Sequence, residues 1–192
     1  MRNFEENVGS SIKVSGRWFD ILRYADGRVV EGAHGSIEWP SNQIQNVFAN
    51  LLAGLCQGHV DAIDGPYLRI GFMAIGHGLV GWDSAPPTLN PNNTTLEDEY
   101  FRKVIASPAD IYFIDPVTNL PTGNVPSPKI EIAVTLGFAE AIGTMREFGL
   151  FGGLATIALD SGEIVNWIFH DKIVKDNSFE LERRVRLLFQ TT

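Results

Sequence analysis

One run of the sequence matches a nucleotide-binding pattern. Residues 76–81, GHGLVG, have the form G-x-G-x-x-G. In a dinucleotide-binding site this run must open a helix, because the free N–H groups and the dipole of the helix N-terminus hold the pyrophosphate. Here Trp82, Asp83 and a double proline follow instead. We therefore interpret the run as the end of a strand, followed by a turn in which a glycine adopts a positive φ angle.

Three consecutive acidic residues are candidates for a catalytic site. Glu97, Asp98 and Glu99 could supply a pair of carboxylates for acid–base chemistry. Arg102 and Lys103 follow at the spacing of ion pairs on a helical turn, and such pairing explains the acids more simply. An enzyme with a carboxylate site at residues 97–99 is kept as a third functional hypothesis.

Other reactive side chains form no recognisable motif. His59, Asp61 and Asp64 lie close in sequence, but their spacing fits no metal-binding loop. The sole cysteine, Cys56, is interpreted as a small core residue rather than a nucleophile. No P-loop, nucleophile elbow, zinc-protease motif or Cys-x-x-Cys pair occurs. The sequence therefore predicts no enzyme activity, no cofactor and no metal site.

Composition narrows the class of protein. The 192 residues are 44% hydrophobic and 20% charged, as in an ordinary globular domain, and the formal net charge is −8. A protein that binds duplex nucleic acid normally presents a basic face, so no nucleic-acid partner is expected. No run reaches the roughly 18 apolar residues of a membrane span, and the N-terminus is acidic, unlike a signal peptide. We expect no membrane insertion, and folding in a cytoplasm.

Alternation of apolar and polar residues predicts a mainly β chain. The Asp-Gly pair at residues 26–27, between two apolar runs, predicts a β-hairpin. Further strands are expected at residues 67–75, 111–114, 130–136, 164–173 and 179–189, and one helical turn is expected within residues 96–105. The predicted fold class is a β-sandwich or jelly-roll-like domain. Residues 1–39 would form an N-terminal arm and hairpin region, and residues 40–192 the main domain.

One amphipathic helix is predicted at residues 41–57, packed on the β-domain. Ser41 is a suitable N-cap, and an apolar stripe from Ile44 to Leu55 follows the helical spacing. The opposite face carries amides and alanines and no charged residue, whereas a solvated helix face normally carries Lys and Glu. This face indicates either contact with a neighbouring subunit or a polar but neutral surface.

Two long segments, residues 84–95 and 115–129, hold seven of the ten prolines. Long loops in a compact chain are usually functional or ordered by a partner, and proline lowers the entropy lost on docking. Together with the neutral helix face, these segments predict contacts between subunits. The predicted assembly contacts are Asn42, Gln45, Asn46, Asn50, Pro86, Pro87, Asn92, Pro121 and Pro126.

Several motifs occur in an order that resembles a known group of proteins. They are the helical run 46–55, IGHGLVGWD at 75–83, TTLEDEYFRK at 94–103, REFGLFG at 146–152, HDKIVK at 170–175 and the alternating strand at 179–189. The set resembles small structural proteins of bacteriophage tails and contractile injection systems, which sit at the tail tip, baseplate, collar or fibre attachment. The resemblance implies a ring or symmetric homo-oligomer without catalysis.

The same resemblance implies the partners and the location. The partners would be copies of the chain and other tail or baseplate proteins. The location would be a virion or phage-tail-like particle, assembled in the bacterial cytoplasm.

Four charged residues lie in the two most characteristic of these motifs. We predict that Glu99, Arg102, Arg146 and Glu147 form a buried or half-buried ion-pair set that holds the long loop onto the β-domain. Such a set would fix geometry more than it would add net stability. Replacement of Arg102 by Ala is therefore expected to hinder assembly or folding.

A carbohydrate-binding module of a receptor-binding fibre is the alternative function. Tryptophans stand at positions 18, 39, 82 and 167, and any of them could stack on a sugar ring if it were exposed in a groove. Most buried aromatic side chains belong to the core instead. Trp82, beside Asp83, is the strongest candidate for a sugar contact.

Overall fold

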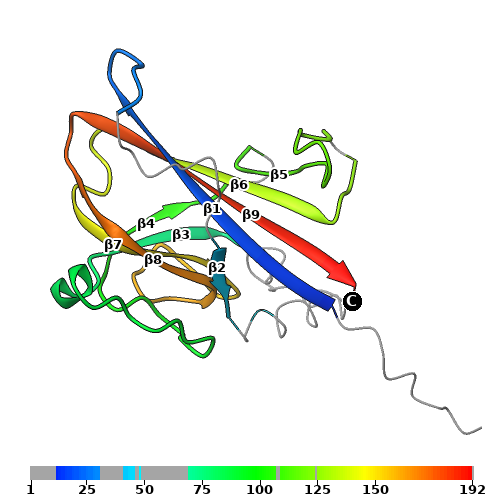
Figure 1. The fold of residues 1–192 in the computed structure, drawn as a ribbon, viewed down its shortest axis with the longest axis horizontal. Coiled ribbons are helices and arrows are strands. Elements are labelled where there is room, and N and C mark those ends of the chain that lie inside the picture. Colours follow the sequence, from blue (N-terminus) through cyan, green and yellow to red (C-terminus); the bar gives the residue numbers. More distant parts are fainter. Residues whose placement is uncertain are drawn as a thin grey trace, which may run out of the picture.

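The computed structural model describes residues 12–30, 41–45, 48, 69–106, 109–123 and 125–191. Nine strands in this part of the chain form a curled antiparallel sheet in the order β4-β3-β7-β8-β2-β1-β9-β6-β5 (Figure 1). The prediction of a mainly β chain is confirmed. The strands are β1 (Ile12–Tyr24), β2 (Ser41–Ile44), β3 (Phe72–Gly76), β4 (Glu99–Val104), β5 (Ile111–Phe113), β6 (Lys129–Leu136), β7 (Gly143–Gly152), β8 (Glu163–Lys175) and β9 (Phe179–Thr191), and a short 3₁₀ helix, η1, spans Val80–Asp83.

The alternating pattern of residues 179–189 decides which side of β9 is buried. β9 lies between β1 and β6 and pairs with β1 along its whole length. Leu181, Val185 and Leu187 point inward and are fully buried. Arg183 shares this inner face, because it falls at the same alternation. The strand predicted here is confirmed, as are those that correspond to β5, β6 and β8.

The Asp-Gly turn predicted at residues 26–27 is confirmed. Gly27 has a φ angle of +84°, and its N–H donates to the carbonyl of Tyr24 at 2.9 Å. Beyond the turn, Val29 forms a single antiparallel bridge with Arg23. Glycine is favoured here because it reaches positive φ without a Cβ clash.

Strand β2 joins the two halves of the sheet, which are β4-β3-β7-β8 and β1-β9-β6-β5. Its presence shows that the helix predicted at residues 41–57 does not begin at Ser41. The strand pairs with β1 on one side and with β8 on the other, so Ser41 begins a strand rather than capping a helix. The apolar stripe starts only at Ile44, and pairing with two neighbours outweighs the weak local preference of the preceding residues. Of the rest of the predicted helix 41–57, Gln45 and Phe48 are described, and residues 46–47 and 49–57 lie outside the described residues.

Strand β4 occupies the place where a helical turn was predicted, and that prediction is wrong. Ile75 of β3 lies opposite Phe101, but the next residue, Gly76, lies opposite Glu99, so β4 carries an irregularity of register at this point. This bulge brings Glu99 and Arg102 to the same side of a strand, although residues three apart normally face opposite ways. Glu99 and Arg102, whose spacing suggested an ion pair on a helical turn, thus form their ion pair in a bulged strand.

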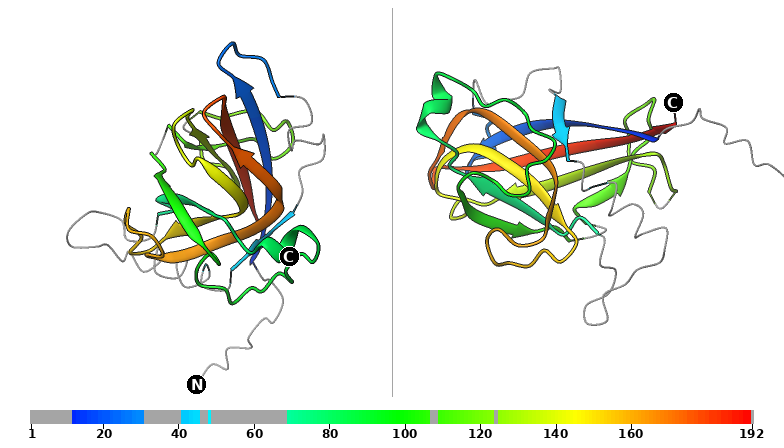
Figure 2. Two further views of the ribbon diagram at one scale, coloured as in Figure 1. Left: turned by 90° about the vertical axis from the view of Figure 1, so that its left-hand side faces the viewer. Right: turned by 90° about the horizontal axis from the view of Figure 1, so that it is seen from below.

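The core lies between the inner faces of the two halves of the sheet. Trp18 of β1 meets Phe148 of β7 edge-on, with 5.6 Å between ring centroids. The guanidinium of Arg183 lies over the same phenyl ring at 3.9 Å. Figure 2 shows how the curl of the sheet brings β1 and β9 across β7 and β8. Consequently β1, from the region predicted as an N-terminal arm and hairpin, shares its sheet and core with residues of the main domain.

Candidate functional site

A pocket of about 430 Å³ opens beside η1. Trp82 and Trp167 meet edge-on in its wall, with ring centroids 6.1 Å apart. The remaining side chains of the wall are mostly amides and hydroxyls from the segment between η1 and β4. The described residues of the wall are Leu79, Trp82, Pro87, Thr88, Asn90, Asn92, Asn93, Thr94, Thr95, Leu96, Glu97 and Trp167.

The glycines of the G-x-G run make room for two side chains of this region. A Cβ built at Gly76 would overlap the carboxylate of Glu147, and one at Gly78 would lie 2.5 Å from the indole ring of Trp82. Gly78 also has a φ angle of +56°. The interpretation of the run as a strand end with a positive φ glycine is therefore confirmed, and the absence of a side chain lets Trp82 lie against the backbone.

Glu147 of β7 holds one wall of the pocket from behind. Its Oε1 accepts hydrogen bonds from the N–H groups of Glu97 and Asp98 at 2.9 and 3.0 Å. Its Oε2 accepts a hydrogen bond from Trp167 Nε1 at 2.8 Å. Burial raises the pKa of Glu147, and the hydrogen bonds from Trp167 and the two backbone groups act in the opposite direction. Because this side chain is fully buried, it positions the wall and does not face the pocket.

Gln45 holds the opposite part of the wall. The amide of Gln45 is oriented so that both its oxygen and its nitrogen have suitable partners. In this orientation Nε2 donates to the carbonyls of Pro91 at 2.6 Å and Asn90 at 3.1 Å. The side chain is buried, and its backbone N–H donates to the carbonyl of Val165 on β8 at 3.0 Å. Gln45 was predicted as an assembly contact, but its side-chain amide is used within the chain.

Arg146 fixes the start of the same segment. Its Nε and one terminal nitrogen donate to the two carboxylate oxygens of Asp83 at 2.7 and 3.0 Å, and the other terminal nitrogen donates to the carbonyl of His77 at 3.1 Å. This fork-like pairing is the main cause that lowers the pKa of Asp83 to about 2, with Lys172 adding a weaker contribution. η1 and the pocket segment are thus anchored at both ends.

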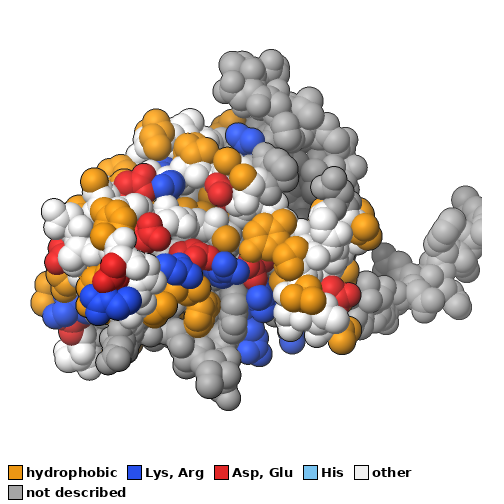
Figure 3. All heavy atoms as spheres, turned by 90° about the horizontal axis from the view of Figure 1, so that it is seen from above, with side chains coloured by type: hydrophobic (Ala, Val, Ile, Leu, Met, Phe, Trp, Pro, Cys, Tyr) orange, Lys and Arg blue, Asp and Glu red, His pale blue; other side chains and the backbone are white. Residues whose placement is uncertain are grey.

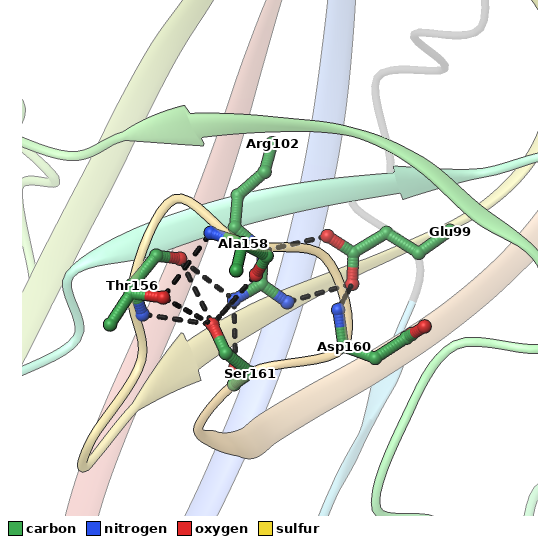
Figure 4. Close-up of polar contacts among 6 residues, drawn as sticks. All are labelled: Glu99, Arg102, Thr156, Ala158, Asp160 and Ser161. Carbon is green, nitrogen blue, oxygen red and sulfur yellow. Dashed lines mark hydrogen bonds and ion pairs between the residues drawn. The ribbon is translucent and has the colours of Figure 1, made fainter.

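The four residues predicted as one ion-pair set fall into three separate arrangements. Arg146 pairs with Asp83, and Glu147 binds N–H groups. Glu99 and Arg102 form a bidentate pair, with both side chains almost fully buried. This last pair holds residues 156–161, because Arg102 donates to two carbonyls of that loop and Glu99 accepts from the N–H of Asp160 (Figure 4). The segment 84–95 is instead anchored by Arg146 and Glu147.

The three consecutive acids do not form one site. Glu99 is in the buried pair, Asp98 lies 3.2 Å from the ring of His77, and Glu97 lines the pocket. Within the described ranges, no group of three or more His, Cys, Asp or Glu side chains could hold a metal ion. His59, Asp61, Asp64 and Cys56 lie outside the described residues.

The other candidate residues are spread over the molecule. Trp18 is buried in the core, Trp82 is half-buried in the pocket wall, and Trp39 lies outside the described residues, as do Asn46 and Asn50. Among the predicted assembly contacts, Pro87 and Asn92 line the pocket, and Asn42 lies in β2 against Gly16. Pro86, Pro121 and Pro126 are exposed.

The arrangement can bind a small molecule that has both an apolar surface and polar groups. Two aromatic rings, several neutral polar side chains and a wall fixed by buried hydrogen bonds form a concave, pre-organised surface. Sequence reasoning identified Trp82, but it did not identify the roles of Gln45 and Glu147. The one sequence signal for the polar wall is the density of Asn and Thr at residues 88–95.

A comparison with models of known protein families gives no match, and a comparison with curated proteins gives none either. No helix among the described residues has the length and apolar character needed to cross a membrane. The function is therefore inferred from the pocket and from the exposed surface.

Proposed function

We propose that the chain is a structural subunit of a bacteriophage tail or a phage-tail-like particle such as a contractile injection system. It assembles into a ring or symmetric homo-oligomer and contacts other tail or baseplate proteins, without catalysis or a cofactor. Its location is the virion or particle, assembled in the bacterial cytoplasm. The proposal includes a β-sandwich or jelly-roll-like arrangement of the curled sheet, with a helix after β2 packed on it. Phe48 supports that packing, because its side chain is buried and its ring centroid lies 6.0 Å from that of Phe189.

The observation that carries the proposal is a set of apolar side chains displayed on two ordered loops. Val117 is 85% exposed and Ile157 is 65% exposed. Ordered surface loops that expose apolar side chains are suited to contacts with other proteins. The exposed side chains are Val117, Leu120 and Val125 on the loop after β5, and Leu154, Ile157 and Leu159 on the loop after β7.

Both loops are held in shape by internal hydrogen bonds. The carboxylate of Asp115 accepts from the N–H groups of Val117 and Thr118 at 2.9 and 2.6 Å. The second loop is held by Arg102, as described above. A loop that is already ordered loses little entropy when it docks. Figure 3 shows hydrophobic side chains exposed at several places on one face, separated by charged side chains of both signs.

The test is the mass of the purified protein in solution, followed by electron microscopy of the particles that it forms. We expect a multi-subunit species with closed symmetry. The double variant Leu120→Asp/Ile157→Asp should shift the mass toward the monomer, whereas Val29→Asp, on the exposed hairpin, should not. A wild-type protein that stays monomeric at every concentration, alone and with candidate tail proteins, would contradict the proposal.

A second candidate function is carbohydrate binding, as in a module of a receptor-binding fibre. The pocket beside Trp82 favours it, because it combines aromatic rings with neutral hydrogen-bonding groups. Glycan binding by the wild-type protein that is lost in Trp82→Ala would support this function. It is compatible with the first, since a particle subunit can also attach to a surface.

A further inference from the structure

We infer that the pocket beside Trp82 takes a neutral saccharide, as a single sugar or the end of a short chain. The inference rests on the second candidate function and specifies the class of ligand. A sugar ring has an apolar face of C–H groups and an edge of hydroxyl groups. The pocket offers a matching surface for each.

The indole of Trp82 provides the apolar surface. Its ring lies against the backbone at Gly78 and edge-on to Trp167, and the pocket lies beside it. These two neighbours restrict the ring, because Trp167 is itself tied to Glu147. A fixed aromatic ring loses little freedom when a ligand stacks on it. The ring therefore serves as a rigid platform for the C–H face of a sugar.

Amide and hydroxyl side chains provide the polar surface. Amides both donate and accept hydrogen bonds, and so do hydroxyls, which matches the dual character of sugar hydroxyl groups. The carboxylate of Glu97 is a further acceptor in the wall. The amide and hydroxyl residues of the wall are Thr88, Asn90, Asn92, Asn93, Thr94 and Thr95.

The charge of the wall argues for a neutral ligand. Among the described residues that line the pocket, none is Lys, Arg or His, so a carboxylate, sulfate or phosphate would find no cation there. Of the cations near η1, Arg146 is bonded to Asp83 and to the carbonyl of His77, and Lys172 also contacts Asp83. Glu97 is the one acidic side chain in the described wall, and a cationic ligand would need it. These ligand classes can therefore be separated by substitution at Glu97.

The size of the pocket limits the ligand to a small unit. A volume of about 430 Å³ lies at the lower end of the range of small-molecule sites. The wall is already fixed by Gln45, Arg146 and Glu147, so binding does not have to order it. We expect recognition of one or two sugar units rather than of a long polymer.

The test is a glycan array probed with the labelled full-length protein, with neutral, acidic and amino-sugar glycans on the same slide. Titration of each neutral hit then gives its dissociation constant. We expect binding to neutral glycans, weakened roughly tenfold or more in Trp82→Ala and roughly threefold in Thr95→Val. Val80→Ala should bind like the wild type, because Val80 is exposed on η1 and does not line the pocket. Glu97→Gln should change the affinity less than threefold, roughly, since Gln retains an acceptor for a neutral hydroxyl.

Each other outcome removes a defined part of the inference. Binding to acidic or amino-sugar glycans alone would overturn the neutral class while carbohydrate binding stands. Neutral binding that is equal in Trp82→Ala and the wild type would overturn the assignment to this pocket. Absence of binding to every glycan would overturn both the inference and the second candidate function. If Trp82→Ala does not fold, Thr95→Val tests the pocket in its place, because it is an isosteric change at an exposed position. Neutral binding that is equal in Thr95→Val and the wild type would then count against this pocket.

Discussion

At the scale of residues, the surroundings of Glu147 act in opposite directions on its pKa. Its carboxylate holds Trp167 and two backbone N–H groups, yet burial raises its pKa, because the charged form is poorly solvated there. A carboxylate with a raised pKa in the folded state binds its proton more tightly than in the unfolded chain. Its contribution to stability is therefore complete below the unfolded value of 4.5 and is lost as the pH rises through the raised pKa.

The prediction for Glu147 concerns the slope of stability against pH. As the pH rises above 4.5, the wild-type protein should lose free energy of unfolding relative to Glu147→Gln, which has no carboxyl group to titrate. Gln also replaces one of the two accepting oxygens by an NH2 group, so the profile of Glu147→Gln should be offset as well as different in slope. Urea denaturation at a series of pH values measures both. Two parallel profiles would contradict the prediction.

Two glycines of the G-x-G-x-x-G run provide a matched pair of substitutions. Gly78 has a positive φ angle and Trp82 lies against it, whereas a Cβ at Gly81 would meet nothing within 4 Å. Gly78→Ala should lower the free energy of unfolding by ~1–3 kcal/mol and displace the Trp82 ring. Gly81→Ala should have little effect. Urea denaturation and tryptophan fluorescence measure these changes, and equal behaviour of the two variants would contradict the assignment.

At the scale of elements, the bulge in β4 decides how the loop after β7 is held. It brings Glu99 and Arg102 together on one side of the strand, and the pair then binds the backbone of residues 156–161. Arg102 also lies over the ring of Phe151 at 4.3 Å, so its charge is enclosed between an aromatic ring and hydrogen-bond acceptors. A buried pair of this kind depends on both partners being present.

Arg102→Ala should leave Glu99 buried without its cation and should lower the free energy of unfolding by ~3–5 kcal/mol. Cleavage by a protease within residues 153–162 should become faster, and assembly should weaken if that loop is an interface. Lys103→Ala is the control on the neighbouring residue, because its ion pair with Glu140 is partly exposed and should contribute only ~0–1 kcal/mol. Unchanged melting, proteolysis and assembly in Arg102→Ala would refute this account.

At the scale of the whole molecule, the two halves of the sheet share the larger of two buried hydrophobic clusters. Asp20 of β1 and Arg183 of β9 form a fully buried pair at its centre, and Arg183 stacks on Phe148 of the other half. Trp18 completes the cluster from β1. The larger buried cluster includes side chains of both halves, and a second, smaller cluster of β3, β7, β8 and Leu96 lies in one half. We therefore expect the described sheet to unfold as one unit.

Asp20→Ala tests this coupling. It should lower the free energy of unfolding by ~3–5 kcal/mol, because it leaves the Arg183 charge buried without its partner. Far-UV circular dichroism and tryptophan fluorescence should report the same shifted midpoint, since Arg183 of this pair also packs on Phe148 of the other half. Asp26→Ala, which removes an exposed pair with Arg28, should leave the midpoint nearly unchanged. Separate transitions by the two probes would contradict a shared core.

Features that depend on local pattern could be predicted from the order of the residues. Alternation predicted β9, and the Asp-Gly pair predicted the turn at Gly27, because side-chain period and φ preference act within a few residues. Tertiary structure decided the features that depend on distant partners. Residues 41–44 form a strand because β1 and β8 pair with them. Residues 99–104 form β4 rather than a helical turn because β3 pairs with them. The pocket likewise needs Gln45, Glu147 and Trp167, which are far apart in the sequence and meet only when the sheet curls.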